Sequence, residues 1–125
     1  LSAAAESGLF DTVGHIDLPK KFGHRLRDSV LKEMAQPTLD RIAAAGMAVE
    51  LNTGGLRKPA REIYPSALLL SLIRERDIPI CFGSDAHQPG QVGQDFDKAL
   101  SLARDVGYTR YVRFRKREKI PTPLP

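Results

Sequence analysis

The segment Ile78-Pro79-Ile80-Cys81-Phe82-Gly83-Ser84-Asp85-Ala86-His87 joins an apolar run to a polar loop. Its apolar part, residues 78–82, predicts a short buried strand that ends at Gly83. Asp85 and His87 then follow the C-terminal end of the strand, which is where α/β barrels and open α/β sheets build their active sites. A carboxylate and an imidazole together can bind Zn, Mn or Fe. The alternative is that Asp85 caps the next turn and His87 is an ordinary surface residue.

On both sides of this segment, strand patterns alternate with amphipathic helix patterns. Alternation of this kind predicts a parallel sheet with right-handed crossover helices. Four parallel strands with outer helices would make half of a barrel or a small open sheet. The predicted strands are residues 12–16, 47–51, 79–83 and 110–114, and the predicted helices are residues 1–7, 28–45, 65–76 and 95–106.

Prolines and apolar spacing refine these boundaries. Pro37 predicts that the second helix is divided into two pieces, because proline removes one helix hydrogen bond. Pro65 fits the first position of the third helix. Pro121 and Pro123 predict an irregular tail after the last strand. The side chains expected to face the core from the second helix are Val30, Leu31, Met34, Leu39, Ile42 and Ala43.

The composition is that of one globular domain. Of 125 residues, 42% are hydrophobic and 27% are charged, which is enough to form a single core. No apolar run approaches the length of a membrane-spanning helix, and we expect no signal peptide. The one cysteine, Cys81, cannot form an internal disulfide and fits a reducing compartment, so we expect a cytoplasmic protein. Because Cys81 lies in the apolar strand, an inert core thiol is expected.

Two features of the chain ends add to this picture. The net charge of +4 is concentrated in residues 110–117, which could bind nucleic acid or an anionic substrate, or could form a solvated edge. The chain opens on residues 1–8 without an initiator Met, and this stretch is typical of the last turns of a helix before a glycine stop. We therefore expect the chain to be a piece of a longer protein.

Polar side chains accompany the predicted end of every strand. Because the C-terminal ends of parallel strands meet at one edge of a sheet, we expect these side chains to converge, as a metal-dependent hydrolase requires. The residues are His15 and Asp17 at the end of the first strand, Glu50 and Asn52 at the end of the second, Asp85 and His87 after the third, and Arg113, Arg115 and Lys116 at the fourth.

An ordered set of motifs spans nearly the whole chain. The motifs are FDTVGHIDL at residues 10–18, KKFG at 20–23, VELNTGGLRK at 49–58, YPS at 64–66, GSDAH at 83–87 and a helix end at 103–108. Together they resemble the C-terminal half of the PHP (polymerase and histidinol phosphatase) superfamily and, within it, the histidinol-phosphate phosphatases. The single motif GSDAH is only moderately specific, whereas the ordered set is a strong signal.

The resemblance implies a distorted (β/α)7 barrel similar to a TIM barrel, with residues 1–125 as the C-terminal portion of a single barrel domain. It implies a cluster of up to three divalent ions, Zn, Mn or Fe, at the C-terminal ends of the strands. His15, Asp85 and His87 match metal ligands of the family, and Asp85 and His87 are also expected to be catalytic. Glu50 and Asn52 match a motif that is not assigned to the metals. Asn52 is expected to orient the substrate or a ligand.

Cationic side chains near the same edge are candidates for binding the phosphate of a substrate. Arg57 lies in a loop with two glycines and could bind phosphate through two parallel hydrogen bonds. The alternative is that Arg57 and Lys58 are an exposed loop pair. Lys21, with Lys20, is a further candidate for the substrate. His24 has no motif support and is expected at the surface.

The function implied by the resemblance is metal-dependent hydrolysis of a small phosphomonoester, histidinol phosphate, in histidine biosynthesis. The family's N-terminal His-x-His, its further histidines and its bridging Glu are absent from this chain, so the fragment alone is expected to be inactive. Its unpaired barrel edges would favour self-association, and no membrane contact is expected.

Two other functions stay open. The first is another PHP phosphoesterase, acting on nucleotides or DNA ends. The second is a non-catalytic, nucleic-acid-binding module that uses the basic C-terminal strand. Against the second, the aromatic residues are few and are not interleaved as stacking platforms.

Overall fold

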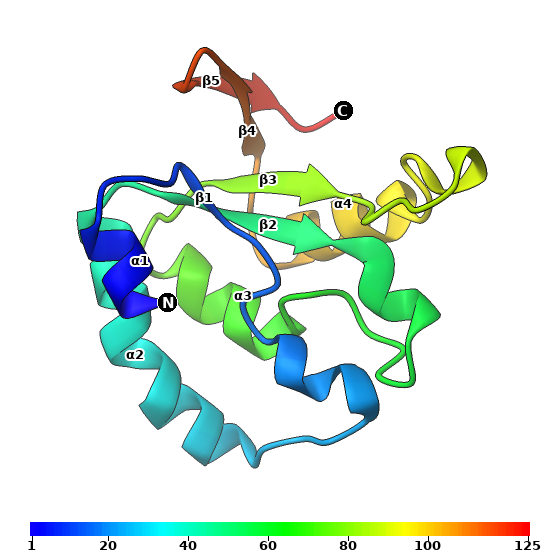
Figure 1. Cartoon of the computed structure of the whole chain (residues 1–125), viewed down its shortest axis with the longest axis horizontal. Helices are drawn as coiled ribbons and strands as arrows, with labels where there is room; N and C mark the ends of the chain where they lie inside the picture. Colours follow the sequence, from blue (N-terminus) through cyan, green and yellow to red (C-terminus); the bar gives the residue numbers. More distant parts are fainter.

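The computed structural model describes residues 1–125 as a parallel sheet with helices packed on one face (Figure 1). The sheet contains β1 (Thr12–Val13), β2 (Ala48–Asn52) and β3 (Ile80–Gly83), in that order. Both pairings are parallel, with Val13 beside Val49 and Val49 beside Ile80. The predicted α/β class with a parallel sheet is therefore confirmed.

The connections between the strands are helical, as the alternation predicts. None of these helices has the length and apolar character needed to cross a membrane. The elements are α1 (Ser2–Glu6), the 3-10 helix η1 (Leu18–Phe22), α2 (Asp28–Ala44), the 3-10 helix η2 (Thr53–Arg57), α3 (Ala67–Arg74), the 3-10 helix η3 (Pro89–Gln91) and α4 (Phe96–Asp105).

The two faces of the sheet have different surroundings, because side chains alternate across a strand. On one face, Val49 packs in a buried cluster with residues of α2 and α3, and Leu51 and Ile80 pack in a second cluster with α3 and α4. The opposite face carries Glu50 beside Cys81 in register. The apolar face therefore anchors the sheet on the helices, and polar groups gather on the other face.

The last strand departs from the sequence prediction. β4 (Arg110–Arg115) does not join the parallel sheet but pairs antiparallel with β5 (Glu118–Pro123) in a separate two-stranded sheet. The prediction of four parallel strands, with 110–114 as the fourth, is therefore wrong, and so is the irregular tail. Proline is tolerated in β5 because an edge strand does not need every backbone N–H for pairing.

Part of the basic C-terminal stretch attaches this hairpin to the rest of the protein. The Arg117 guanidinium donates to both Asp11 carboxylate oxygens, at 2.9 and 3.2 Å, and to the Gly8 carbonyl at 3.3 Å. Lys119 Nζ donates to the Gly46 carbonyl. These cations bind the protein's own N-terminal segment and the loop before β2.

Proline positions also differ from the prediction. Pro37 lies inside one continuous helix, α2, and not at a break between two pieces. It is on the exposed side, where water can satisfy the carbonyl that loses its helix partner. Met34, expected in the core, is 65% exposed on the same helix. Helix α3 begins after Pro65, with the Ser66 hydroxyl accepting from the Leu69 N–H as its cap.

Candidate active site

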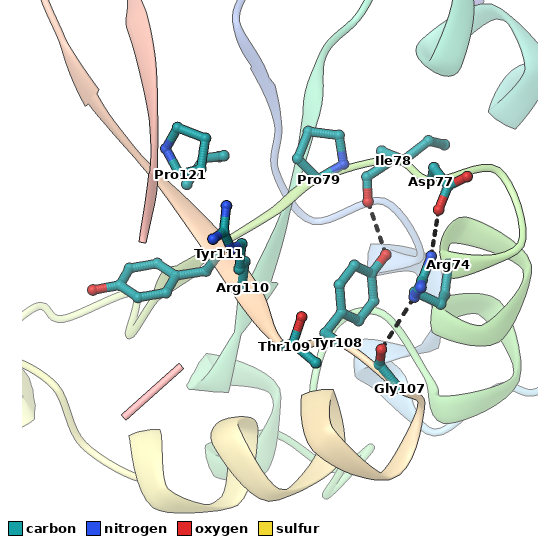
Figure 2. A pocket seen from close by; sticks show the side chains of 11 residues that line it. Arg74, Asp77, Ile78, Pro79, Gly107, Tyr108, Thr109, Arg110, Tyr111 and Pro121 are labelled. Atoms are coloured by element: carbon teal, nitrogen blue, oxygen red, sulfur yellow. Dashed lines mark hydrogen bonds and ion pairs between the residues drawn. The ribbon is translucent and has the colours of Figure 1, made fainter. Parts of the chain in front are cut away.

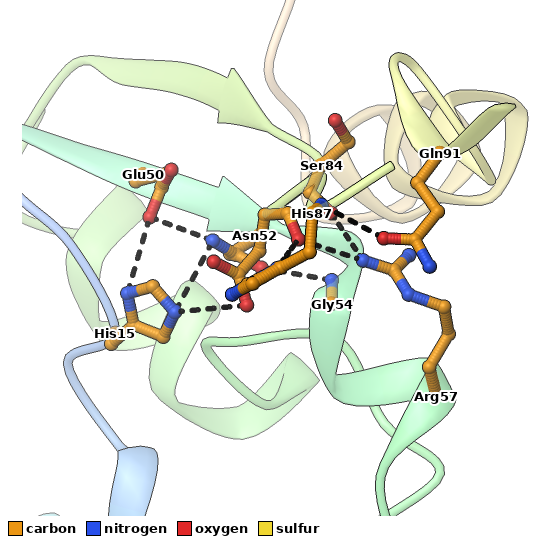
Figure 3. A network of polar contacts seen from close by, with 9 residues as sticks. His15, Glu50, Asn52, Gly54, Arg57, Ser84, His87 and Gln91 are labelled. Carbon is orange, nitrogen blue, oxygen red and sulfur yellow. Dashed lines mark hydrogen bonds and ion pairs between the residues drawn. The ribbon is translucent and has the colours of Figure 1, made fainter. Parts of the chain in front are cut away.

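Four polar side chains converge where the parallel strands end (Figure 3). His15 Nδ1 lies 3.7 Å from Glu50 Oε2, and His15 Nε2 lies 3.8 Å from Asp85 Oδ2. The Asn52 amide donates to Glu50 Oε2 at 3.0 Å and lies 3.5 Å from His15 Nε2. The structure thus brings together His15, Glu50, Asn52 and Asp85, which come from three neighbouring strands and the loops that follow them.

Backbone conformation places the two outer members of this cluster. Strand β1 is shorter than predicted and ends at Val13, so His15 stands in the following segment. His15 has a φ of 51° and Asp85 a φ of 50°, both in the left-handed region that non-glycine residues seldom adopt. Such conformations are concentrated at functional sites, where the surrounding structure holds them in place.

Glycines make room for the carboxylates. A Cβ added at Gly83 would overlap the Glu50 carboxylate, and one added at Gly14 would lie 3.0 Å from Glu50 Oε2. A Cβ at Gly54 would lie 3.0 Å from Asp85 Oδ2. The backbone therefore approaches both acidic side chains more closely than any other residue would permit.

Arg57 and His87 both bind the backbone of the loop after β3. Arg57 Nη2 donates to the Ser84 carbonyl at 2.5 Å and to the Asp85 carbonyl at 3.2 Å, whereas its Nη1 is buried without a partner. His87 Nδ1 lies 2.8 Å from the same Asp85 carbonyl, and the His87 side chain is exposed. Arg57 is therefore not the exposed loop residue of the alternative interpretation, because it braces the Asp85 loop.

Lys20 is the centre of a second, more buried polar cluster. Its Nζ lies 2.7 Å from Asp17 Oδ2 and 3.0 Å from Glu62 Oε2, and it donates to the Ile63 carbonyl at 2.7 Å. Asp17 Oδ2 also accepts from the Ser66 N–H at 2.9 Å. The lysine thus joins the segment after His15 to the chain before α3. Asp17, Lys20, Glu62 and Ser66 also line a cavity of about 660 Å³ next to α2 and α3.

Some predicted residues lie apart from the His15–Asp85 cluster. Lys21 Nζ is 4.8 Å from the centre of the Phe22 ring and makes no ion pair. Lys58 and His24 are exposed. Cys81 is half-buried, and burial together with the Glu50 charge raises the pKa of its thiol to about 11, so the thiol stays protonated at neutral pH.

Sequence reasoning missed Tyr64 as a member of this region. Its ring centre is 5.8 Å from that of His15, and its hydroxyl is buried without a partner. Its backbone N–H and C=O pair with Asn52 at 3.0 and 2.7 Å, which places it directly beside the end of β2. The available signals were its place before Pro65, which indicated the start of a helix, and the YPS motif at residues 64–66, to which no role in the site was assigned.

The donor chemistry fits a divalent ion in part. His15 Nε2 and Asp85 Oδ2 face each other as an imidazole and a carboxylate. Because a carbonyl oxygen can only accept, His87 Nδ1 carries the proton toward Asp85 and leaves Nε2 free, as in metal-binding histidines. No group of three or more His, Cys, Asp or Glu side chains is placed to hold an ion by itself. The chain can therefore supply metal ligands, but not a complete metal site.

A small pocket at the opposite end of β3 has a structural explanation (Figure 2). Its volume is about 220 Å³, and its polar groups bind one another. Tyr108 Oη donates to the Ile78 carbonyl at 2.8 Å, and Arg74 binds Asp77 at 2.5 Å and the Gly107 carbonyl at 3.2 Å. This pocket precedes the strand, whereas α/β proteins build active sites at the other end.

Comparisons with known proteins identify relatives of this chain. Residues 68–96 match a family model described as PHP-associated. The chain is 50% identical over 121 residues to a "Probable histidinol-phosphatase" of Deinococcus radiodurans, which covers 97% of this chain and 45% of the relative. It is 38% identical over 92 residues to a "Histidinol-phosphatase" of Bacillus subtilis, covering 70% of this chain and 34% of the relative.

A solved structure is similar as well. A crystal structure from Listeria monocytogenes, provisionally named a histidinol phosphatase, matches with a TM-score of 0.63 and 30% identity, covering 78% of this chain and 40% of that one. The chain thus spans less than half the length of these relatives.

Proposed function

We propose that this chain, which is 50% identical over 97% of its length to a relative named "Probable histidinol-phosphatase", forms part of a metal-dependent enzyme that hydrolyses a small phosphomonoester, with histidinol phosphate as the substrate. The observation that carries the proposal is the approach of His15 Nε2 to Asp85 Oδ2, 3.8 Å apart, where parallel strands end. The names of the relatives support the reaction class.

In this proposal, His15, Asp85 and His87 hold divalent ions, Zn, Mn or Fe, with up to three in the complete protein. When bound, such ions polarise phosphate oxygens and lower the pKa of a water molecule. In the hydrolysis, the water oxygen bonds to phosphorus, the bond from phosphorus to the ester oxygen breaks, and the alcohol leaves with a proton. Glu50 and Asn52 orient the His15 ring, because both lie within 3.7 Å of its nitrogens.

Binding of the substrate phosphate is assigned to cationic side chains. Arg57 braces the Asp85 loop with Nη2 and has an unpaired Nη1, so it retains donors for a phosphate oxygen. Lys21 is proposed as a second cation, because its ammonium is not committed to an ion pair. Asn52, at the end of β2, is proposed to orient the substrate or a ligand.

The proposal includes the architecture around the site. In the three-stranded sheet, β1 and β3 each have an outer edge without a strand partner. We propose that these edges continue into a distorted (β/α)7 barrel in the complete protein, with this chain as its C-terminal half. In the isolated chain the same edges would favour self-association. Cys81 is a free thiol, as is usual in a reducing compartment, and we place the protein in the cytoplasm.

The test is steady-state hydrolysis of histidinol phosphate by the full-length protein with added Mn²⁺ or Zn²⁺. Asp85→Asn and His87→Gln should each lower kcat/KM by more than about 100-fold, beyond the loss typical of a group that only supports a ligand. The fold should persist, because the Asp85 carboxylate accepts no hydrogen bond and His87 is exposed. His24→Gln is the matched control and should retain activity. Near-normal turnover in Asp85→Asn would disprove its metal role.

A further inference from the structure

The buried hydroxyl of Tyr64 has no hydrogen-bond partner. The residue is only 1% exposed, so water does not replace the missing partner at the surface. Unpaired buried hydroxyls are rare because each loses its hydrogen bonds to water without compensation. Such a group in a folded protein therefore needs an explanation, and a place in the functional site is one of the recognised reasons.

Two adjacent glycines pack against Tyr64 and Asp85. A Cβ added at Gly55 would lie 2.8 Å from Tyr64 Cζ, the carbon that carries the hydroxyl, and one at Gly54 would lie 3.0 Å from Asp85 Oδ2. The phenol and the Asp85 carboxylate thus pack against consecutive residues of η2. Burial and the charges of Asp17 and Asp85 raise the pKa of Tyr64.

The Asp85 carboxylate is a candidate acceptor for this hydroxyl. The Asp85 carboxylate accepts no hydrogen bond in the structure, and the polar side-chain atom that pairs with it, His15 Nε2, is 3.8 Å away. Asp17 is the other carboxylate whose charge raises the pKa of Tyr64. It is already bound by Lys20 at 2.7 Å and by the Ser66 N–H at 2.9 Å, although its Oδ1 has no partner.

We propose that Tyr64 is a positioning residue, whose hydroxyl donates a hydrogen bond to the Asp85 carboxylate when Asp85 and His15 engage a cation. The inference rests on the proposed function, because it requires that Asp85 acts as a ligand. The hydrogen bond fixes the orientation of the carboxylate and adds to the affinity for the cation, as hydrogen bonds to metal-binding carboxylates do. Because the hydroxyl has no partner in the structure, we expect it to add little to the stability of the fold itself.

The test compares Tyr64→Phe with Tyr108→Phe in the full-length protein. Both changes remove one buried hydroxyl, but the Tyr108 hydroxyl donates to the Ile78 carbonyl at 2.8 Å and lies far along the sheet from Asp85. In metal-free protein, Tyr64→Phe should leave the urea midpoint unchanged or raise it, whereas Tyr108→Phe should lower it. In a Mn²⁺ titration, Tyr64→Phe should weaken binding by about 10- to 100-fold, and Tyr108→Phe should not.

The contrary results are equally specific. If Tyr64→Phe lowers the urea midpoint and leaves Mn²⁺ affinity unchanged, the hydroxyl serves the fold, with Asp17 Oδ1 as its partner, and the inference is overturned. If the wild type binds Mn²⁺ and hydrolyses histidinol phosphate but Tyr64→Phe behaves identically, the inference fails and the proposed function stands. If the wild type neither binds Mn²⁺ nor hydrolyses the ester, the proposed function fails and the inference with it.

Discussion

Replacing Lys20 by methionine should destabilise the fold strongly, whereas the same change at Lys21 should have little effect. The Lys20 side chain is 10% exposed, and its ammonium lies within 3.0 Å of Asp17, Glu62 and the Ile63 carbonyl. Lys21 is the next residue in the same 3-10 helix and makes no ion pair, so it is a matched control.

The size of the effect follows from what the methionine would leave behind. Removing one partner of a buried ion pair typically costs about 3–5 kcal/mol, because the other charge remains buried without compensation. The lower end, about 3 kcal/mol, is expected here. Asp17 keeps the Ser66 N–H at 2.9 Å, and Glu62 keeps Arg25 at 3.4 Å. The expected loss of about 3 kcal/mol is a large fraction of the roughly 5–15 kcal/mol that stabilises a typical domain. The Lys21→Met change should stay within about 0.5 kcal/mol.

Urea unfolding followed by far-ultraviolet circular dichroism measures both variants against the wild type. A lower midpoint with an unchanged slope would report a loss of stability without a change in the surface exposed on unfolding. If Lys20→Met and Lys21→Met have the same midpoint, the buried ion pair does not contribute as described. Lys20 would then be free to bind substrate, as the sequence alone allowed.

Three other changes test the sheet and the site. Burial and Glu50 raise the pKa of Cys81 from 9.0 to about 11, so the unfolded chain loses this proton first. The free energy of unfolding should therefore fall between about pH 9 and pH 11. In Cys81→Ser, urea titrations across that range should show a smaller decrease of this free energy with pH. Gly83→Ala forces a Cβ onto the Glu50 carboxylate and should cost about 1–3 kcal/mol. Gly90→Ala meets nothing within 4 Å and should have the wild-type midpoint. Arg57→Lys should raise KM for the phosphorylated substrate more than it lowers kcat, because one ammonium cannot replace a planar fork; equal KM values would contradict that assignment.

The part of the fold that the sequence predicted is the part governed by local patterns. Apolar runs ended by glycine or proline indicated the three parallel strands, and β2 spans Ala48–Asn52 where residues 47–51 were predicted. The rule that parallel strands end at one edge then predicted that the polar residues at the strand ends would converge. His15 and Asp85 do approach each other, whereas the His87 side chain is exposed and contacts only the Asp85 carbonyl. The prediction was wrong for Arg113, Arg115 and Lys116, because β4 belongs to a separate sheet. His15 and Asp85 both lie after strand ends, so an error of one or two residues in a boundary did not affect their convergence.

The C-terminal hairpin could not be predicted because its turn carries no sequence signal. Lys116 and Arg117 form a two-residue turn with φ values of 50° and 69°. Turns of this type usually contain Asn-Gly or Asp-Gly, since glycine adopts positive φ without strain. Two basic residues in that place suggest a solvated edge, and Pro121 and Pro123 argue against a strand. The pairing is instead supported by Arg117, which binds Asp11 across the molecule.

The roles of Arg57 and Tyr64 depend on contacts between distant parts of the chain. Arg57 binds the carbonyls of Ser84 and Asp85, 27 and 28 residues away. Tyr64 becomes a candidate only because its hydroxyl is buried without a partner. Neither spacing nor composition contains that information, because it arises from how η2 packs against the loop after β3.

The most direct test of the central claim is phosphate release by the full-length protein after its metals have been removed and Mn²⁺ or Zn²⁺ has been returned. Histidinol phosphate and a nucleoside monophosphate should be compared at equal concentration. The account predicts hydrolysis of histidinol phosphate that disappears without the ion, returns with it and exceeds hydrolysis of the nucleotide. Hydrolysis that is unaffected by metal removal, or no release of phosphate with either ion, would contradict the claim that His15 and Asp85 belong to a metal-dependent phosphatase site.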